Sequence, residues 1–175
     1  MDVMQLRRNL MMGKGKSKNL FNINAPFQNP SDTGSGNARK RIFTPYTHCY
    51  GCSGNNYWNT NNISYNVAND TLTVSAVTAY GVDFALPLPP GKYRISADNA
   101  TYQRVNIGFY KSDGTWISAL NSVIYAPANS NNPFVVPENC AITLIVFAVS
   151  TNYETTTYKK IQVEAGDTIT PYEPF

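Results

Sequence analysis

The chain has 175 residues and a net charge of +3, with 42% hydrophobic and 14% charged residues. A chain of this length can bury roughly two thirds of its unfolded surface, which suits one domain with a short appendage. The longest apolar run, 140–149, is about half the ~20 residues that a spanning helix needs, and Arg7 and Arg8 interrupt the apolar start, so we expect neither a membrane span nor a secretory signal.

The first predicted element is an amphipathic helix over residues 2–12. Its apolar side chains recur at helical spacing, but eleven residues are too few to hold a helix alone in water. The helix therefore needs a partner, and the glycines and lysines of 13–17 make a flexible joint behind it. The residues predicted to dock or oligomerise are Val3, Met4, Leu6, Arg7, Arg8, Leu10 and Met11.

Residues 22–41 are rich in Asn, Pro, Gly and Ser and predict an extended loop or linker that ends on Arg39, Lys40 and Arg41. Residues 1–41 hold eight basic and two acidic residues, a net +6, whereas the remainder has a net −3. The split indicates a basic arm on a mildly acidic body, whose target is an acidic protein surface or nucleic acid. The alternative is that this basic arm is a solvated, flexible tail.

Three cysteines, Cys49, Cys52 and Cys140, leave an odd count that intramolecular disulfides cannot exhaust. With His48 they suggest zinc, but adjacent His48 and Cys49 are poorly placed to bind one ion, and Cys140 would complete a site only if the fold brought it close. We expect no metal site and leave open whether the cysteines are reduced or paired.

Short strand signals follow at spacings near ten residues, separated by turn residues, which is typical of a sandwich. Alternation puts Leu72, Val74 and Ala76 on one face, and the two apolar faces of 141–150 predict a central strand. The predicted strands are Ile42 to Thr47, Ile63 to Val67, Thr71 to Val77, Val82 to Leu86, Gly91 to Ala97, Val105 to Lys111, Ser122 to Tyr125, Pro133 to Val136, Ala141 to Ser150 and Thr157 to Glu164.

The last predicted strand, within 160–175, has Ile161 and Val163 on a buried face and Gln162 and Glu164 on the opposite one. Pairing of this closing strand with the start of the domain would cover edges that otherwise invite association.

The segment KIQVEAGDTITPYEPF (160–175) resembles the closing segment of carbohydrate-binding-module-like sandwich domains in phage virion proteins. Asn19-Leu20-Phe21 resembles their opening strand, Pro90 to Ser96 an internal strand, and Gly108 to Gly114 a hairpin, so the resemblance extends over most of 19–175. It implies a mainly β fold, an antiparallel jelly-roll-like β-sandwich over 19–175, behind the short α-helical arm of residues 1–18. The stretch 22–54 departs from the pattern.

The resemblance also implies exposed aromatics that stack on sugar rings. The predicted glycan contacts, in or beside loops, are Tyr57, Trp58, Tyr80, Tyr102 and Trp116. Calcium accompanies many such sandwiches, and Asp83, Asp98 and Asp113 are conceivable ligands, although no calcium-loop spacing appears.

Catalysis finds little support, because the acidic residues are scattered and His48 is the single histidine. We expect no enzyme activity, no cofactor and no nucleic-acid binding. The sequence predicts a virion structural protein, a decoration, fibre or adhesion module docked on a capsid, portal, neck or tail component, with a homotrimer favoured and host glycans as contacts. The alternative is a stand-alone carbohydrate-binding receptor module.

Overall fold

The described part of the chain is built from strands. The structure is a computed structural model that describes residues 19–28, 30–33, 40–50, 63–76, 81–98, 104–124, 133–148, 155–168 and 170–175. None of these residues forms a helix that could cross a bilayer. The strands are β1 (Ser31–Thr33), β2 (Lys40–Ile42), β3 (Thr47–Tyr50), β4 (Ile63–Ala68), β5 (Thr71–Ala76), β6 (Gly81–Leu86), β7 (Gly91–Asp98), β8 (Arg104–Tyr110), β9 (Trp116–Ile124), β10 (Phe134–Val136), β11 (Ile142–Ala148) and β12 (Thr156–Ala165).

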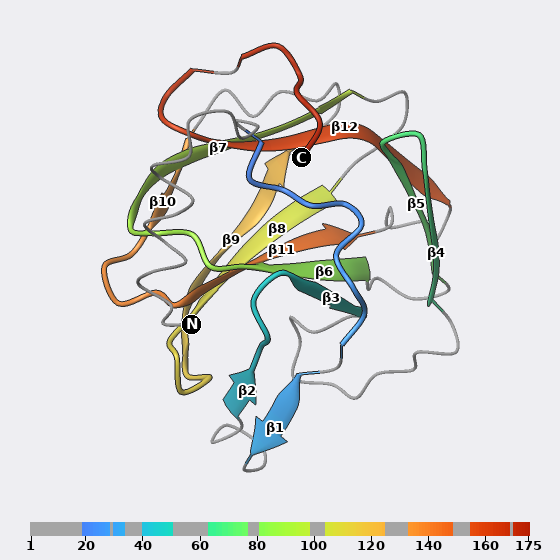
Figure 1. Cartoon of the computed structure of the whole chain (residues 1–175). Coiled ribbons are helices and arrows are strands. Elements are labelled where there is room, and N and C mark those ends of the chain that lie inside the picture. The colour runs from blue at the N-terminus through green and yellow to red at the C-terminus, as the bar shows by residue number, and fades with distance from the viewer. Residues whose placement is uncertain are drawn as a thin grey trace.

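Ten of these strands form two five-stranded sheets, in the orders β10-β7-β12-β5-β4 and β3-β6-β11-β8-β9. Every pairing within both sheets is antiparallel. The sheets face each other as two layers, with the small β1-β2 ribbon at one end (Figure 1). The predicted mainly β, antiparallel sandwich is confirmed. The predicted helical arm of residues 1–18, with its docking residues, lies outside the described residues.

The space between the sheets is filled by the apolar faces that strand alternation predicted. Leu72 and Val74 of β5 and Ile107 of β8 are fully buried there. Phe21 joins them from the start of the domain, with its ring centroid 4.7 Å from that of Phe84 and 5.4 Å from that of Phe147. Each such side chain contributes roughly 1.5–3 kcal/mol on burial, so this core is the main source of stability.

Strand β11 lies in the centre of its sheet, as its two apolar faces predicted. It pairs with β6 on one side and with β8 on the other. Ile145 and Phe147 enter the core between the sheets, whereas Leu144 and Val146 point to the opposite face. There they belong to a second buried group, the outer cluster, formed by Phe43, Cys49, Ala85, Tyr110, Ile142, Leu144 and Val146.

The beginning of the domain is fastened to its closing strand, as predicted. The Leu20 backbone N–H donates to the Val163 carbonyl at 2.8 Å. The buried Asn19 side chain continues this pairing, because its Nδ2 donates to the Ile161 carbonyl at 2.9 Å and its Oδ1 accepts from the Val163 N–H at 3.0 Å. The side chain of Asn19 thus acts in place of a strand backbone beside β12.

Two predictions for the region before β4 are corrected. The single strand predicted over 42–47 is a turn between β2 and β3, because Pro45 has no N–H to pair and Tyr46 has a φ of 60°. The loop predicted over 22–41 contains β1 and β2, and its Ile23 and Ala25 are buried in the core. This segment has few apolar residues among many Asn, Pro and Gly residues, so its sequence pattern did not predict the strands or the buried residues.

Two further predictions fail on the later strands. Strand β9 begins at Trp116, six residues before the predicted start, because it follows directly on the 111–115 turn. Gln162 and Glu164, predicted on an exposed face, are 1% and 5% exposed. Residues 170–175, the C-terminal segment, fold back over them. Glu173 N–H donates to Gln162 Oε1 at 2.7 Å, and the Thr170 hydroxyl donates to Glu164 Oε1.

Candidate functional site

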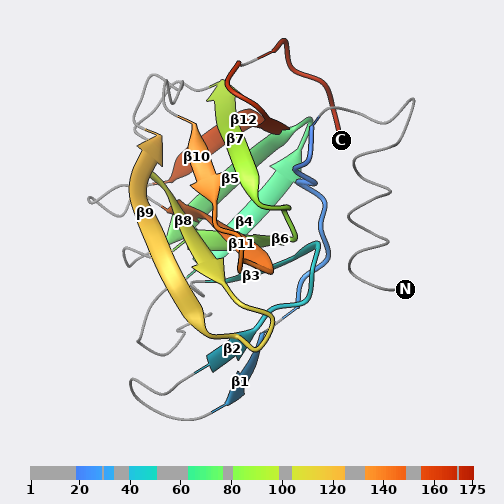
Figure 2. The same ribbon diagram turned by 90° about the vertical axis from the view of Figure 1, so that its left-hand side faces the viewer.

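The candidate functional residues lie at two opposite ends of the sandwich (Figures 1 and 2). The terminal pole comprises Asn19–Asn24, the Asn69–Asp70 turn between β4 and β5, and the C-terminal segment, which together line one pocket. The distal pole comprises the β1-β2 ribbon and the 111–115 turn between β8 and β9. Because Asn19 follows Lys18 in the sequence, residues 1–18 connect to the sandwich at the terminal pole.

Trp116 is the predicted glycan-contacting residue that lies in the described part of the chain. It is the first residue of β9, an edge strand, and pairs with Tyr110 of β8. Its side chain is 58% exposed, and Leu120 of the same strand is 40% exposed. An indole this exposed offers a flat face on which a sugar ring can stack. The other four predicted contacts, Tyr57, Trp58, Tyr80 and Tyr102, lie outside the described residues.

The 111–115 turn that precedes Trp116 is held against β2. Lys40 Nζ lies 2.7 Å from Asp113 Oδ2, and the Arg41 N–H donates to the Gly114 carbonyl at 3.2 Å. The hydrogen bond from Lys40, with further ones from Thr115, lowers the pKa of Asp113 well below its ordinary value. Gly114 has a φ of +79°, and a Cβ there would lie 2.6 Å from the Arg41 carbonyl oxygen, so only glycine permits this approach.

Of the basic run at 39–41, the structure describes Lys40 and Arg41, and these two residues do not form an exposed charged patch. Lys40 is paired with Asp113, and Arg41 is 6% exposed. Tyr110 of β8 and Asp83 of β6 are buried on the face of the β3-β6-β11-β8-β9 sheet that points away from the other sheet. Burial, and then the negative charge of Asp83, raises the pKa of Tyr110 to about 12, while Arg41 opposes the shift. Arg41, Tyr110 and Asp83 are therefore buried groups and form no open charged surface.

The predicted calcium ligands are dispersed rather than gathered. Asp83 is fully buried in β6, Asp113 pairs with Lys40, and Asp98 lies 3.2 Å from Lys160 Nζ. Within the described residues, no group of three His, Cys, Asp or Glu side chains is arranged to hold a metal ion.

The residues considered for zinc have other roles. Cys49 is disulfide-bonded, and Cys140 is a buried free thiol whose Sγ lies 3.1 Å from the Ile142 carbonyl. His48 Nδ1 lies 2.6 Å from the Ala25 carbonyl, and burial lowers the pKa of His48. His48 also exchanges backbone hydrogen bonds with Pro26 and Gln28, so it fastens the N-terminal segment to β3.

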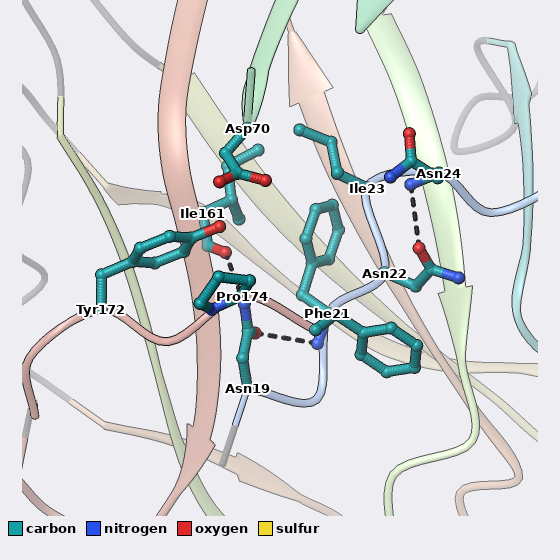
Figure 3. A pocket seen from close by; sticks show the side chains of 10 residues that line it. Asn19, Phe21, Asn22, Ile23, Asn24, Asp70, Ile161, Tyr172 and Pro174 are labelled. Carbon is teal, nitrogen blue, oxygen red and sulfur yellow. Dashed lines mark hydrogen bonds between the residues drawn. The ribbon is translucent and has the colours of Figure 1, made fainter. Parts of the chain in front are cut away.

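Sequence reasoning missed the pocket at the terminal pole. This terminal pocket has a volume of about 60 Å³, and Figure 3 shows the Tyr172 hydroxyl next to the Asp70 carboxylate in its wall. Burial raises the pKa of Tyr172 to about 12, and the charge of Asp70 and a hydrogen bond to its carboxylate add to the shift. The lining residues are Asn19, Phe21, Asn22, Ile23, Asn24, Asp70, Ile161, Tyr172, Pro174 and Phe175.

The wall of the terminal pocket is held by several hydrogen bonds. Asn19 binds β12 and also accepts the Phe21 N–H at 3.0 Å, while Asn22 Oδ1 accepts the Asn24 N–H at 2.9 Å. Asp70 has a φ of 56°, and its carbonyl accepts the Lys160 N–H at 2.8 Å. The Asn-Asp turn was the available sequence signal, but a turn does not predict which distant residues will meet it.

The sequence matches no protein-family model and no curated protein. One similar solved structure is the enzymatically active domain of bacteriophage CBA120 tailspike protein 4, with a TM-score of 0.45 and 16% identity over 59% of this chain and 18% of that chain. Another is the C-terminal family 22 carbohydrate binding module of Clostridium thermocellum Xyn10B, with a TM-score of 0.39 and 12% identity over 62% of this chain and 82% of that chain.

Proposed function

We propose that the chain is a non-enzymatic module of a bacteriophage virion, in which the N-terminal arm docks the sandwich on a capsid, neck or tail component. The distal pole then contacts glycans on the host surface. In this proposal the sandwich is a jelly-roll-like, carbohydrate-binding-module-like domain, and the chain serves as a decoration, fibre or adhesion protein that assembles as a homotrimer.

The observation that carries the proposal is the position of Trp116. Its indole is 58% exposed at the start of β9, although the sandwich has a large apolar core in which an indole could be buried. It follows the turn of the distal pole, which is opposite the end where the arm is attached (Figure 2). One end of the body can therefore be anchored while the other end presents an aromatic surface.

The closing segment gives independent support. The residues that resemble the end of phage virion sandwiches, 160–175, form β12 and the C-terminal segment, and they fasten Asn19 and Leu20 beside them. In this proposal the closure begins at Asn19, and residues 1–18, which precede it in the sequence, make the docking contact. The arm has five basic residues and one acidic residue, so an acidic surface is its natural partner.

Binding is favoured over catalysis because four of the described carboxylates already have partners. Asp113 pairs with Lys40 at 2.7 Å, Asp98 with Lys160 at 3.2 Å, and Asp167 with Lys92 at 3.6 Å. Glu164 accepts the Thr170 hydroxyl beneath the C-terminal segment. Hydrolysis of a glycosidic bond needs two carboxyl groups free to act on one substrate, and these four are held in separate places.

Trp116→Ala tests the glycan contact. We expect it to lower binding on a glycan array or to whole host cells by at least about tenfold, with a change in unfolding free energy below about 0.5 kcal/mol. Leu120→Ala is the matched control, because it removes an exposed apolar side chain from the same strand. Unchanged glycan binding by Trp116→Ala, or no glycan binding by the intact folded chain, would contradict this part.

Deletion of residues 1–18 tests the anchoring. We expect the shortened protein to keep the cooperative unfolding of the sandwich while losing incorporation into virions and its oligomeric state in sedimentation experiments. The second candidate, a stand-alone carbohydrate-binding receptor module, predicts the opposite pair of results: unaffected assembly together with glycan binding.

A further inference from the structure

We propose that the terminal pocket receives a basic side chain, specifically an arginine, from the virion protein on which the chain docks. This inference rests on the proposed function, because it places a second, oriented contact beside the arm at the anchored end. Three observations support it: the size of the pocket, the carboxylate of Asp70 and the aromatic rim formed by Tyr172 and Phe175.

The size of the pocket favours a side chain over a free small molecule. The space of about 60 Å³ is far below the roughly 300–1,000 Å³ typical of pockets that enclose a ligand. A sugar ring or a nucleotide could not be enclosed here. The planar head of one side chain, delivered by a protein that binds elsewhere as well, is compatible with this volume.

Asp70 provides the charge that would select the occupant. A carboxylate can accept about four hydrogen bonds, so Asp70 can take further donors beside the neighbouring Tyr172 phenol. Among the described residues that line the pocket there is no lysine or arginine. The ammonium group of Lys160, a residue within β12, lies 3.2 Å from the Asp98 carboxylate. A cation from a partner would therefore meet a carboxylate that has no lysine or arginine beside it in the described part of the pocket wall.

The position of Asp70 is fixed, which favours a geometrically demanding partner. Asn69 and Asp70 both have positive φ values, 51° and 56°, and the Asp70 carbonyl accepts the Lys160 N–H. The Tyr172 hydroxyl lies next to the carboxylate in the pocket wall (Figure 3). A fixed carboxylate suits the planar fork of a guanidinium, which donates two parallel hydrogen bonds, better than it suits an ammonium group.

The aromatic rim completes the match to arginine. Phe175 is 58% exposed at the edge of the pocket, and the Tyr172 ring forms part of its wall. A guanidinium stacks on aromatic faces while its edge hydrogen-bonds a carboxylate, and neither a carboxylate nor a phosphate could do so here. The exposure of Phe175 is thereby explained as a partner contact.

The charge of the terminal pocket is negative, whereas the charge of the N-terminal arm is positive. The arm has a net charge of +4, from five basic residues and one acidic residue, so it seeks an acidic surface, whereas the pocket accepts a cation. Two neighbouring contacts of opposite charge fix the orientation of the chain on its partner. In a rotated orientation, like charges would face each other. The arm would tether the module and the pocket would orient it.

The test is a titration of the isotope-labelled full chain with N-acetyl-arginine amide, followed by backbone NMR. We expect saturable shifts at Asp70, Tyr172 and Phe175 with a Kd of roughly 1–10 mM. N-acetyl-citrulline amide is the neutral probe of equal shape and should bind at least about tenfold more weakly. Asp70→Asn should weaken arginine binding by roughly tenfold or more, whereas Asp98→Asn, which alters an exposed carboxylate outside the pocket, should leave it unchanged.

Phe175→Ala provides a second variant in case Asp70→Asn disturbs the turn. Because Phe175 is largely exposed, its loss should leave the fold intact and weaken arginine binding by roughly threefold. Equal binding of citrulline and arginine, or unchanged binding by both variants, would overturn the inference. Failure of the arm deletion to affect virion incorporation would defeat the proposed function but would leave this titration result as it stands, so the two failures are distinguishable.

Discussion

The terminal and distal poles are closed by different kinds of interaction. At the terminal pole, the buried Asn19 side chain makes three hydrogen bonds, of which two go to the backbone of β12. At the distal pole, an exposed ion pair between Lys40 and Asp113 and the close approach of Gly114 to Arg41 hold β2 against the turn.

The difference indicates how the two ends respond to change. Buried hydrogen bonds cannot be replaced by water when a partner is lost, so the terminal pole is coupled to the stability of the whole sandwich. An exposed ion pair exchanges readily with water and contributes little. We therefore expect the exposed Lys40–Asp113 pair of the distal pole to tolerate substitution and the buried Asn19 of the terminal pole to resist it.

Asn19→Ala should have the largest effect on stability. It leaves the Val163 N–H, the Phe21 N–H and the Ile161 carbonyl without their partner, and we expect a loss of about 3 kcal/mol in urea unfolding. Asn22→Ala is the control, because Asn22 makes one exposed bond, to the Asn24 N–H, and should cost less than about 1 kcal/mol. Equal losses for the two variants would show that the buried bonds of Asn19 stabilise the terminal pole no more than the exposed bond of Asn22 does.

Gly114→Ala should be the most disruptive single change at the distal pole. The substitution adds a Cβ 2.6 Å from the Arg41 carbonyl at a φ of +79°, so both crowding and backbone strain oppose it. We expect a loss of about 2 kcal/mol together with release of β2, measured by unfolding and by hydrogen exchange at Arg41. Gly166→Ala separates the two causes, since Gly166 has a φ of +108° but open space around it, and should cost about 1 kcal/mol.

His48 fastens the segment that runs between the poles, and its protonation should loosen that segment. Burial lowers the pKa of His48 in the folded state below its ordinary value of 6.5. The folded protein therefore binds fewer protons than the unfolded chain just below pH 6.5, so this contribution to stability is complete above pH 6.5 and declines as the pH falls.

This pH dependence can be measured directly because the chain has a single histidine. Unfolding free energies between pH 7.5 and pH 5 should fall on the acid side for the native protein. His48→Asn retains a donor near the Ala25 carbonyl and should flatten the profile over that interval. An identical slope in the variant would show that other groups cause the acid loss.

Lys40→Met should have the smallest effect. Both side chains of the Lys40–Asp113 pair are about half exposed, at 44% and 54%, so water and salt screen the interaction. We expect the stability difference between the variant and the native protein to diminish further in 1 M salt. In the native protein the lowered pKa of Asp113 implies a contribution that is present above pH 3.8 and lost below it, and the variant should lack that dependence.

The sequence by itself determined the strands whose apolar residues alternate. The core residues Leu72, Val74, Ile107 and Phe147 were predictable because a period of two assigns each side chain to a face, and the doubly apolar β11 was predictable as central. The meeting of β12 with Asn19 followed from the closing motif. These features depend on local spacing, which the sequence states directly.

Three features followed only from the tertiary structure: the terminal pocket, the burial of Gln162 and Glu164, and the pairing or burial of the basic residues Lys40 and Arg41. Asp70, Tyr172 and Asn22 come from three distant parts of the chain, and their meeting depends on how β12 and the C-terminal segment cross the β4-β5 turn. Likewise Lys40 finds Asp113 across 73 positions of sequence. Polar contacts between remote segments have no period in the sequence, because their partners are set by sheet order and register rather than by neighbouring residues.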